Sequence, residues 1–150
     1  MELPIGHAKY TKMACHKLPA MRAGGDGDIL IAASSRKLLE LWRLHMSGDL
    51  VFYTCIELTD SPHNMLFSSC GTIVCCCEGR STVSLRSTQT LEAVSTLKQP
   101  GDEVCGISFA SRGDITAMNK SFGENSGEQD DTVVICCNSG RVAVLFVYIP

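Results

Sequence analysis

Cysteine is the residue type in this sequence with the clearest capacity for chemistry. Thiolates bind zinc, exchange disulfides and act as nucleophiles. The chain of 150 residues contains nine cysteines, at Cys15, Cys55, Cys70, Cys75, Cys76, Cys77, Cys105, Cys136 and Cys137. Because the number is odd and five of the nine stand next to another cysteine, a secreted disulfide framework is not expected.

The cysteine spacing also argues against a structural zinc site. Such sites use closely spaced pairs whose thiolates converge on one tetrahedron, and the sequence has no C-x-x-C pair. Cys75, Cys76 and Cys77 lie in an apolar run that predicts a strand, where successive side chains point to opposite faces. We therefore interpret the thiols as small buried hydrophobic side chains in a reducing compartment. Metal or redox chemistry that depends on them is the alternative.

Neither the histidines nor the glycine-rich segment matches a catalytic motif. The four histidines are scattered, at His7, His16, His45 and His63, although nucleophilic catalysis requires a base beside the nucleophile. Cys15 and His16 are adjacent in sequence, but neighbours on an extended chain point apart. The segment 24–28 carries two aspartates and precedes a predicted strand, so it suits a connector better than a phosphate or calcium loop. We expect no catalytic residue, no metal and no cofactor.

Composition restricts the class of protein further. With 45% hydrophobic and 19% charged residues, the chain can bury a core, and wholesale disorder is not expected. The net charge is -3 and no cluster of lysine and arginine occurs, which argues against direct contact with nucleic acid. The longest apolar run near the C-terminus, 142–149, is far shorter than the ~20 residues that span a bilayer. Residues 1–10 lack the apolar region of a secretory signal, so we expect a soluble chain in the cytoplasm or nucleus.

The sequence repeats itself at intervals of 42 to 44 residues. Phe67-Ser-Ser-Cys-Gly71 recurs as Phe109-Ala-Ser-Arg-Gly113, 42 positions later. The apolar run 72–77 follows the first of these segments, and 132–137 follows the second after an insertion. The run 28–33 is an earlier copy of the same element. Cysteines in the later copies stand where the first copy has alanines, which supports their interpretation as small buried residues. Repeats of this length are typical of propellers and other repeat folds.

A third apolar run occurs in all three units, and a fourth occurs in the first two. After a polar turn, a third run occupies 38–44, 82–86 and 142–146, and a fourth occupies 50–56 and 90–97. Short apolar runs bounded by Gly, Ser and Asn are typical of β-hairpins. Four short strands per unit of about 42 to 44 residues is the period of a propeller blade.

These units predict an all-β fold, a partial β-propeller of about three four-stranded antiparallel blades. The expected blades are 9–58, 62–97 and 103–150, and the last lacks its outer strand because 142–149 ends the sequence. A closed propeller needs about four to eight blades. We therefore expect open sheet edges at both ends that another part of a longer protein, or a partner, covers.

Residues 29–43 resemble the second and third strands of a WD40 repeat, with Trp42 at the tryptophan of the closing dipeptide. Residues 104–114 are similar to the first strand of such a repeat and the turn after it. The resemblance covers about 28–150, and a divergent first strand is expected between Lys9 and Lys17. It implies a degenerate WD40-like β-propeller, a fold that usually serves as a rigid platform in multi-subunit assemblies.

The sequence departs from the WD40 pattern at three points. Arg43 stands where the aspartate of the dipeptide is expected, and Arg86 replaces the tryptophan in the second copy. No Gly-His pair precedes the strands, and His63 lies too close to Phe67 to take that part. The family's buried hydrogen-bond network is therefore expected to be missing. Packing and ladder hydrogen bonds alone would then hold the blades.

Two groups of residues are candidates for particular roles. Trp42 is expected to pack between adjacent blades, and structural roles are also expected for Phe67, Gly71, Phe109 and Gly113. The polar insertion 115–131 is expected to be a solvated loop. Its acidic residues form a candidate docking site for a basic partner, namely Glu124, Glu128, Asp130 and Asp131. Long loops on a rigid scaffold often carry function.

The sequence thus predicts a scaffold for protein–protein interaction that is not an enzyme. We expect it to be a subunit of a multi-protein complex whose other protein subunits complete the propeller. The alternative is a cysteine-dependent metal-binding or redox protein. Fold-level analogy does not choose the biological process.

Overall fold

The structure is a computed structural model that describes residues 10–20, 25, 27–98, 101–110 and 131–147. All regular secondary structure in these residues is β-strand, in elements β1 to β11. Within the described ranges there is no helix of the length and hydropathy that would cross a membrane.

The strands form three antiparallel sheets in which each strand pairs with its neighbours in sequence. Sheet 1 consists of β1 (Lys12–Lys17), β2 (Ile29–Ser35), β3 (Leu38–Leu44) and β4 (Leu50–Glu57). Sheet 2 consists of β5 (Pro62–Phe67), β6 (Ile73–Glu78), β7 (Thr82–Ser87) and β8 (Ala93–Lys98). Sheet 3 consists of β9 (Val104–Ala110), β10 (Asp131–Cys137) and β11 (Val142–Val147).

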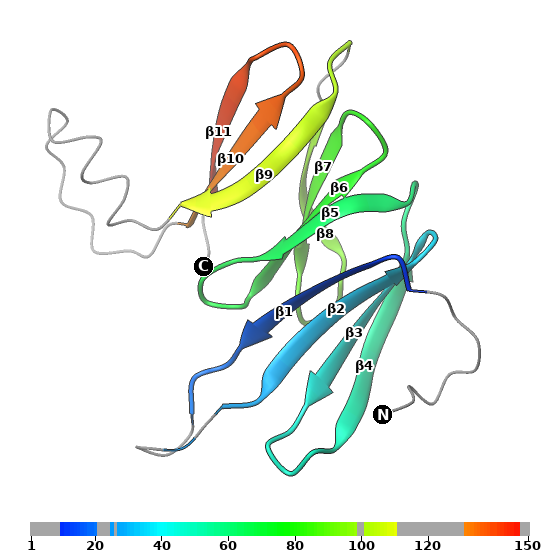
Figure 1. The fold of residues 1–150 in the computed structure, drawn as a ribbon, viewed down its shortest axis with the longest axis vertical. Helices are drawn as coiled ribbons and strands as arrows, with labels where there is room; N and C mark the ends of the chain where they lie inside the picture. Colours follow the sequence, from blue (N-terminus) through cyan, green and yellow to red (C-terminus); the bar gives the residue numbers. More distant parts are fainter. Residues whose placement is uncertain (1–9, 21–24, 26, 99–100, 111–130, 148–150) are drawn as a thin grey trace, which may run out of the picture.

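The three sheets are arranged as successive blades of a propeller (Figure 1). The first strands of the sheets contact one another in order, β1 with β5 and β5 with β9. The fourth strands, β4 and β8, are the outermost strands of sheets 1 and 2, and within the described residues β11 is the outermost strand of sheet 3. The predicted all-β partial propeller with a three-stranded last blade is confirmed by this topology.

Tight turns with a left-handed backbone residue join the second and third strands of every blade. The residue is Arg36 in sheet 1 (φ 55°), Gly79 in sheet 2 (φ 62°) and Gly140 in sheet 3 (φ 83°). Positive φ values match the right-handed twist of the flanking strands. Glycine adopts them without steric conflict, so two of the three hairpins have the residue that their turn requires.

Two apolar clusters fill the spaces between the blades. Between sheets 1 and 2 lie Ala32, Leu39, Leu41, Leu58, Met65, Val74, Cys76 and Leu91. Between sheets 2 and 3 lie Ile73, Cys75, Cys77, Val83, Leu85, Val104, Val133, Ile135 and Cys137. Strand β6 contributes to both clusters because alternate side chains of a strand point to opposite faces.

The cysteines of β6 are small core residues, as the sequence predicts. Cys75, Cys76 and Cys77 are fully buried, and Cys137 is 4% exposed. The prediction is wrong for the other five cysteines, which are exposed, namely Cys15, Cys55, Cys70, Cys105 and Cys136. These five lie on outer strands, on sheet faces away from the two clusters, or in turns, where no second sheet covers them.

Candidate functional site

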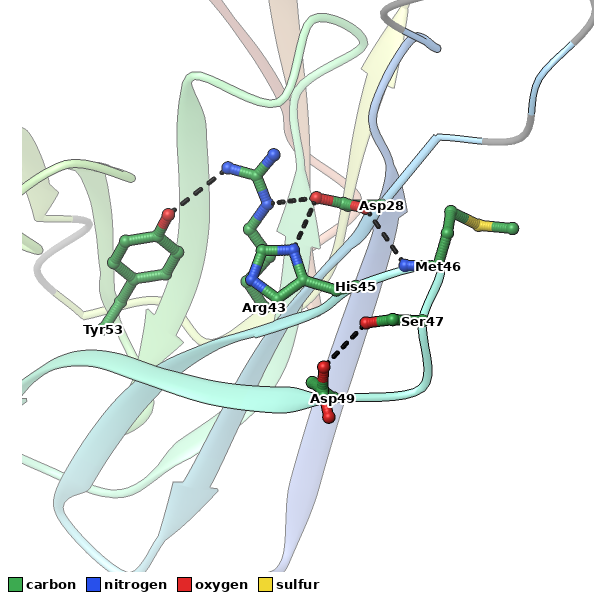
Figure 2. A network of polar contacts seen from close by, with 7 residues as sticks. All are labelled: Asp28, Arg43, His45, Met46, Ser47, Asp49 and Tyr53. Carbon is green, nitrogen blue, oxygen red and sulfur yellow. Dashed lines mark hydrogen bonds and ion pairs between the residues drawn. The ribbon is translucent and has the colours of Figure 1, made fainter.

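A polar network joins the start of β2 and the end of β3 to β4, the outermost strand of sheet 1 (Figure 2). The Arg43 Nε donates to Asp28 Oδ2 over 2.7 Å, and His45 Nδ1 lies 2.9 Å from the same oxygen. The Met46 backbone N–H donates to Asp28 Oδ1 over 3.2 Å. On its other side, Arg43 Nη1 donates to the Tyr53 hydroxyl over 3.3 Å. The guanidinium is thereby held between an acid and a phenol.

Local strand geometry brings these side chains together. Asp28 directly precedes β2, and Arg43 on β3 pairs with Leu30 near the start of β2. Tyr53 is the extra residue of a bulge in β4, because Leu41 pairs with Thr54 whereas Trp42 pairs with Phe52. A bulge redirects a side chain out of the regular alternation. It is the bulge that places the Tyr53 hydroxyl beside Arg43.

The network keeps its acid and its base charged. Partial desolvation would raise the pKa of Asp28, but the hydrogen bonds from Arg43, His45 and Met46 outweigh it and the pKa is lowered. The hydrogen bonds to Tyr53 and Asp28 raise the pKa of Arg43. The sequence identified Arg43 as a departure from the WD40 pattern but did not identify its partners. The sequence signal that could have indicated the contact is the acidic Asp28 before β2 and the basic Arg43 near the end of β3, which an antiparallel hairpin brings together.

A cleft between sheets 1 and 2 lies next to this network. It has a volume of about 380 Å³. Its apolar lining comes from Leu18, Leu30 and Leu41, and Arg43 and Tyr53 lie on its wall. Sheet 2 contributes the polar residues Thr72, Thr88 and Gln89. Cavities with an apolar lining and a few fixed polar groups are typical of binding sites.

Large apolar side chains are exposed on β4 and on the turn before it. Val51, Phe52 and Tyr53 are 41%, 42% and 52% exposed, and Met46 is 56% exposed. The corresponding strand of sheet 2, β8, has one exposed large apolar residue, Val94. Val51 pairs with Arg43 and Phe52 pairs with Trp42, so the exposed side chains flank this edge strand on both of its faces. We call Met46, Val51, Phe52 and Tyr53 the β4 patch.

Sheet 2 contains a buried ion pair. Arg86 Nη2 donates to Glu78 Oε1 over 2.9 Å and Arg86 Nη1 donates to the Leu91 carbonyl over 2.9 Å. Ser84 Oγ donates to the same Glu78 oxygen, and Thr59 Oγ1 donates to Glu78 Oε2 over 3.3 Å. The expectation that packing and ladder hydrogen bonds alone hold the blades is therefore wrong. A charged network that the sequence pattern did not reveal ties β6, β7 and the β7–β8 connection together.

Trp42 is buried but does not lie between the described blades. Leu39 and Leu41 belong to the cluster between sheets 1 and 2, so Glu40 and Trp42, which alternate with them on β3, face away from sheet 2. Trp42 is 3% exposed, and its Nε1 donates to Glu40 Oε2 over 3.1 Å. The Tyr10 hydroxyl donates to the same oxygen over 2.7 Å. This differs from the expected position between adjacent blades. The sequence indicates that Trp42 is buried, but the register of β3 decides on which face of sheet 1 its side chain lies.

The remaining sequence candidates are separate from one another. Phe67 and Phe109 are half-buried against the clusters on either side of sheet 2. Gly71 has a φ of 74°, and a Cβ there would lie 2.5 Å from the His16 ring. Asp131, expected in the insertion, is the first residue of β10. Gly113, Glu124, Glu128 and Asp130 lie outside the described residues.

The cysteines do not converge on a metal site in the part of the chain that the structure describes. No group of three or more His, Cys, Asp or Glu side chains there is placed to hold an ion. Burial raises the pKa of Cys76 and of Cys77 to about 12. Thiols with such pKa values stay protonated at neutral pH and are poor ligands and nucleophiles.

Comparison with known proteins finds similarity to solved structures. No protein-family model matches the sequence, and no curated protein matches it. Among solved structures, the chain is similar to the WD40 domain of SCAP from fission yeast, with 10% identity and a TM-score of 0.49. The match covers 79% of this chain and 30% of that chain, so this chain spans less than a third of it. The propeller assignment rests on the order and pairing of the strands.

Proposed function

We propose that this chain is a scaffold for protein–protein interaction and a subunit of a multi-protein complex, in the cytoplasm or nucleus. The observation that carries the proposal is the β4 patch, where Val51, Phe52 and Tyr53 are exposed on the outermost strand of sheet 1. An exposed apolar edge strand is a liability for a protein that has no partner. The same strand can accept an extended segment of another protein as an additional strand.

The network beside the patch supports the same proposal. Tyrosine and arginine are among the residue types enriched at the energetic centres of interfaces, and Arg43 is held by Asp28 and Tyr53. A side chain that is already ordered loses less conformational entropy on binding. The cleft lined by Leu18, Leu30 and Leu41 lies within reach of a partner that contacts Tyr53, since Tyr53 lies on its wall.

The acidic insertion is a second proposed docking element. We propose, from its composition, that Glu124, Glu128, Asp130 and Asp131 attract a basic partner, since complementary charge accelerates association. Deleting 121–129 tests this role, with affinity for the partner measured at two salt concentrations. Unchanged affinity and unchanged salt dependence would show that the insertion does not contact the partner.

We propose that the protein is not an enzyme, and the state of its cysteines supports this. The buried thiols are protonated at neutral pH, as their raised pKa values require. The exposed thiols lie on different elements, for example Cys15 on β1 and Cys136 on β10. Stoichiometric zinc in the purified chain, or rapid thiol labelling without denaturant, would favour the alternative of a metal-binding or redox protein.

The scaffold proposal is tested by purifying the full chain from cells under native conditions and measuring the mass of its complexes. We expect Phe52→Lys and Tyr53→Lys to reduce the recovery of associated subunits at least tenfold, because a charge then stands in the apolar contact. Val94→Lys on β8 is the matched control, since Val94 occupies the corresponding bulge. All three positions are exposed, but Phe52 also packs against Trp42 and Tyr53 accepts a hydrogen bond from Arg43, so thermal unfolding of each variant must show that it is folded before its recovery is compared. A chain that migrates alone, or variants that all behave like the wild type, would contradict the proposal.

A further inference from the structure

Sheet 2 carries a polar cavity that is separate from the cleft and from the β4 patch. The cavity has a volume of about 460 Å³ and lies beside the β6–β7 turn and the connection from β4 to β5. The buried side chains of Glu78, Ser84 and Arg86 form its floor. Because Ser84 and Arg86 pair with Cys76 and Val74, which belong to the cluster with sheet 1, the cavity opens on the face of sheet 2 that is turned toward sheet 1.

The rim of this cavity is rich in hydrogen-bond donors. Arg80 from the turn and Lys98 from the end of β8 are exposed cations that line the cavity, and we place them on its rim together with the hydroxyl side chains of Ser81, Thr82 and Thr96. Lys98 pairs directly with Thr82 across β7 and β8, and Thr96 pairs with Ser84. The structure gives none of the five rim side chains a hydrogen bond or ion pair to another described residue, so their donors are available to a ligand.

The charges in the cavity favour an anion. Its lining holds three cationic side chains and two carboxylates. On the floor, Glu78 and Arg86 neutralise each other through their hydrogen bonds. On the rim, the negative charge of Asp60 offsets one of the two positive charges of Arg80 and Lys98, and Asp60 Oδ1 accepts the Ser61 backbone N–H. The rim therefore carries one positive charge in excess, together with hydroxyls that donate without adding charge.

We propose that this cavity binds a phosphate monoester. A phosphate group offers several strong acceptor oxygens, and arginine and lysine bind it through charge-assisted hydrogen bonds. A volume of about 460 Å³ lies within the range of small-molecule sites and exceeds what an inorganic ion fills. The phosphate contacts Arg80, Lys98 and the hydroxyls, and the organic part of the ester occupies the rest of the cavity. This site does not depend on the scaffold proposal.

The proposal is tested by thermal unfolding of the full chain with O-phosphoserine, with inorganic phosphate and with serine. O-phosphoserine should stabilise the chain saturably, because a ligand that binds only the folded state raises its stability. Serine should have no effect, and inorganic phosphate should bind more weakly than the ester. Equal affinities for phosphate and O-phosphoserine would overturn the assignment to a monoester.

Variants locate the site. Arg80→Gln and Lys98→Gln should each weaken O-phosphoserine binding about tenfold, which is the loss of one charge-assisted contact. Asp60→Asn should strengthen it, because it removes the opposing charge. Arg141→Gln is the matched control, since Arg141 is the exposed arginine of the corresponding β10–β11 turn. Equal weakening by Arg80→Gln, Lys98→Gln and Arg141→Gln would indicate a general effect of charge and overturn the proposal.

The same phosphate chemistry has two sources, and a capped ligand separates them. N-acetyl-O-phosphoserine amide carries the phosphate but lacks the free amino and carboxyl groups. Binding as tight as that of O-phosphoserine would support a phosphorylated side chain on a partner protein. Tight binding of O-phosphoserine alone would support a free small molecule. Absence of saturable binding by both ligands would overturn the proposal.

Discussion

Arg86 directs two nitrogens at one carboxylate oxygen, with Nε 3.2 Å and Nη2 2.9 Å from Glu78 Oε1. Both side chains are buried in sheet 2, and Arg86 stands where the first blade has Trp42. An ion pair thus occupies a position that an aromatic side chain fills elsewhere in the repeat. The exchange is tolerated because Ser84, Thr59 and the Leu91 carbonyl supply the remaining hydrogen bonds.

Removing one partner of this pair should be far more damaging than removing both. Arg86→Met leaves a buried carboxylate without its counter-charge, so we expect the free energy of unfolding to fall by about 3–5 kcal/mol. Glu78→Met should have a similar effect. The double variant should lose much less than the sum of the two single losses. Urea denaturation of all four proteins measures the coupling, and additive losses would show that the pair does not act as a unit.

Trp42 should report its burial and its hydrogen bond separately. Trp42→Ala should lower the free energy of unfolding by about 3–5 kcal/mol, the usual loss for a large buried side chain. Trp42→Phe keeps an aromatic ring but removes the donor to Glu40. This change should lower the free energy of unfolding by about 1–3 kcal/mol. The fluorescence of the only tryptophan should be blue-shifted from free indole in the folded chain. Emission at the free-indole wavelength before unfolding would contradict the burial.

His16 should make the fold sensitive to mild acid. Desolvation lowers the pKa of His16 below its ordinary value of 6.5, and its ring lies 5.9 Å from that of Phe67. The unfolded chain therefore takes up this proton at higher pH than the folded chain does. The contribution of His16 is complete above pH 6.5 and is lost as the pH falls toward the folded pKa.

The comparison for this prediction is His16→Phe, which keeps a ring beside Phe67 but does not titrate. The difference in midpoint temperature between wild type and variant should change between about pH 7.5 and pH 5. His45→Gln is the control variant, because it removes the histidine beside Asp28 and leaves His16 in place; the pH dependence due to His16 should remain in this variant. A difference between wild type and His16→Phe that is constant with pH would show that His16 does not contribute.

The cysteines should separate into two reactivity classes. The exposed thiols, Cys15, Cys55, Cys70, Cys105 and Cys136, should react with iodoacetamide in the folded chain. The buried thiols, Cys75, Cys76, Cys77 and Cys137, should react only after unfolding, because burial keeps them protonated and inaccessible. Peptide mass spectrometry of samples labelled with and without denaturant distinguishes the classes. Rapid labelling of Cys76 without denaturant would contradict the structure.

Gly71 should tolerate a side chain less well than Gly140. Both have positive φ values, 74° and 83°, so alanine at either position should lose about 1–2 kcal/mol from backbone strain. A Cβ at Gly71 would also lie 2.5 Å from the His16 side chain, whereas nothing lies within 4 Å at Gly140. We therefore expect Gly71→Ala to lower the midpoint of thermal unfolding more than Gly140→Ala. Equal shifts in midpoint would show that the His16 side chain moves away from the new Cβ without loss of stability.

The strands were predictable because their signal is local. The apolar runs 38–44, 82–86 and 142–146 coincide with β3, β7 and β11 to within a residue at each end. Alternation of side chains along a strand and the turn residues between strands are written in consecutive positions. The placement of Cys75, Cys76 and Cys77 in a core strand follows from the same local pattern.

The partners of individual side chains were decided by the tertiary structure. The sequence alone determined three strand-turn repeats, small residues at their centres and the departures at Arg43 and Arg86. It did not determine that Arg86 meets Glu78, that Tyr53 reaches Arg43, or that Trp42 faces away from sheet 2. The contact of Tyr53 with Arg43 depends on the bulge in β4, and the other two depend on strand register, because a shift of one position moves a side chain to the other face of the sheet.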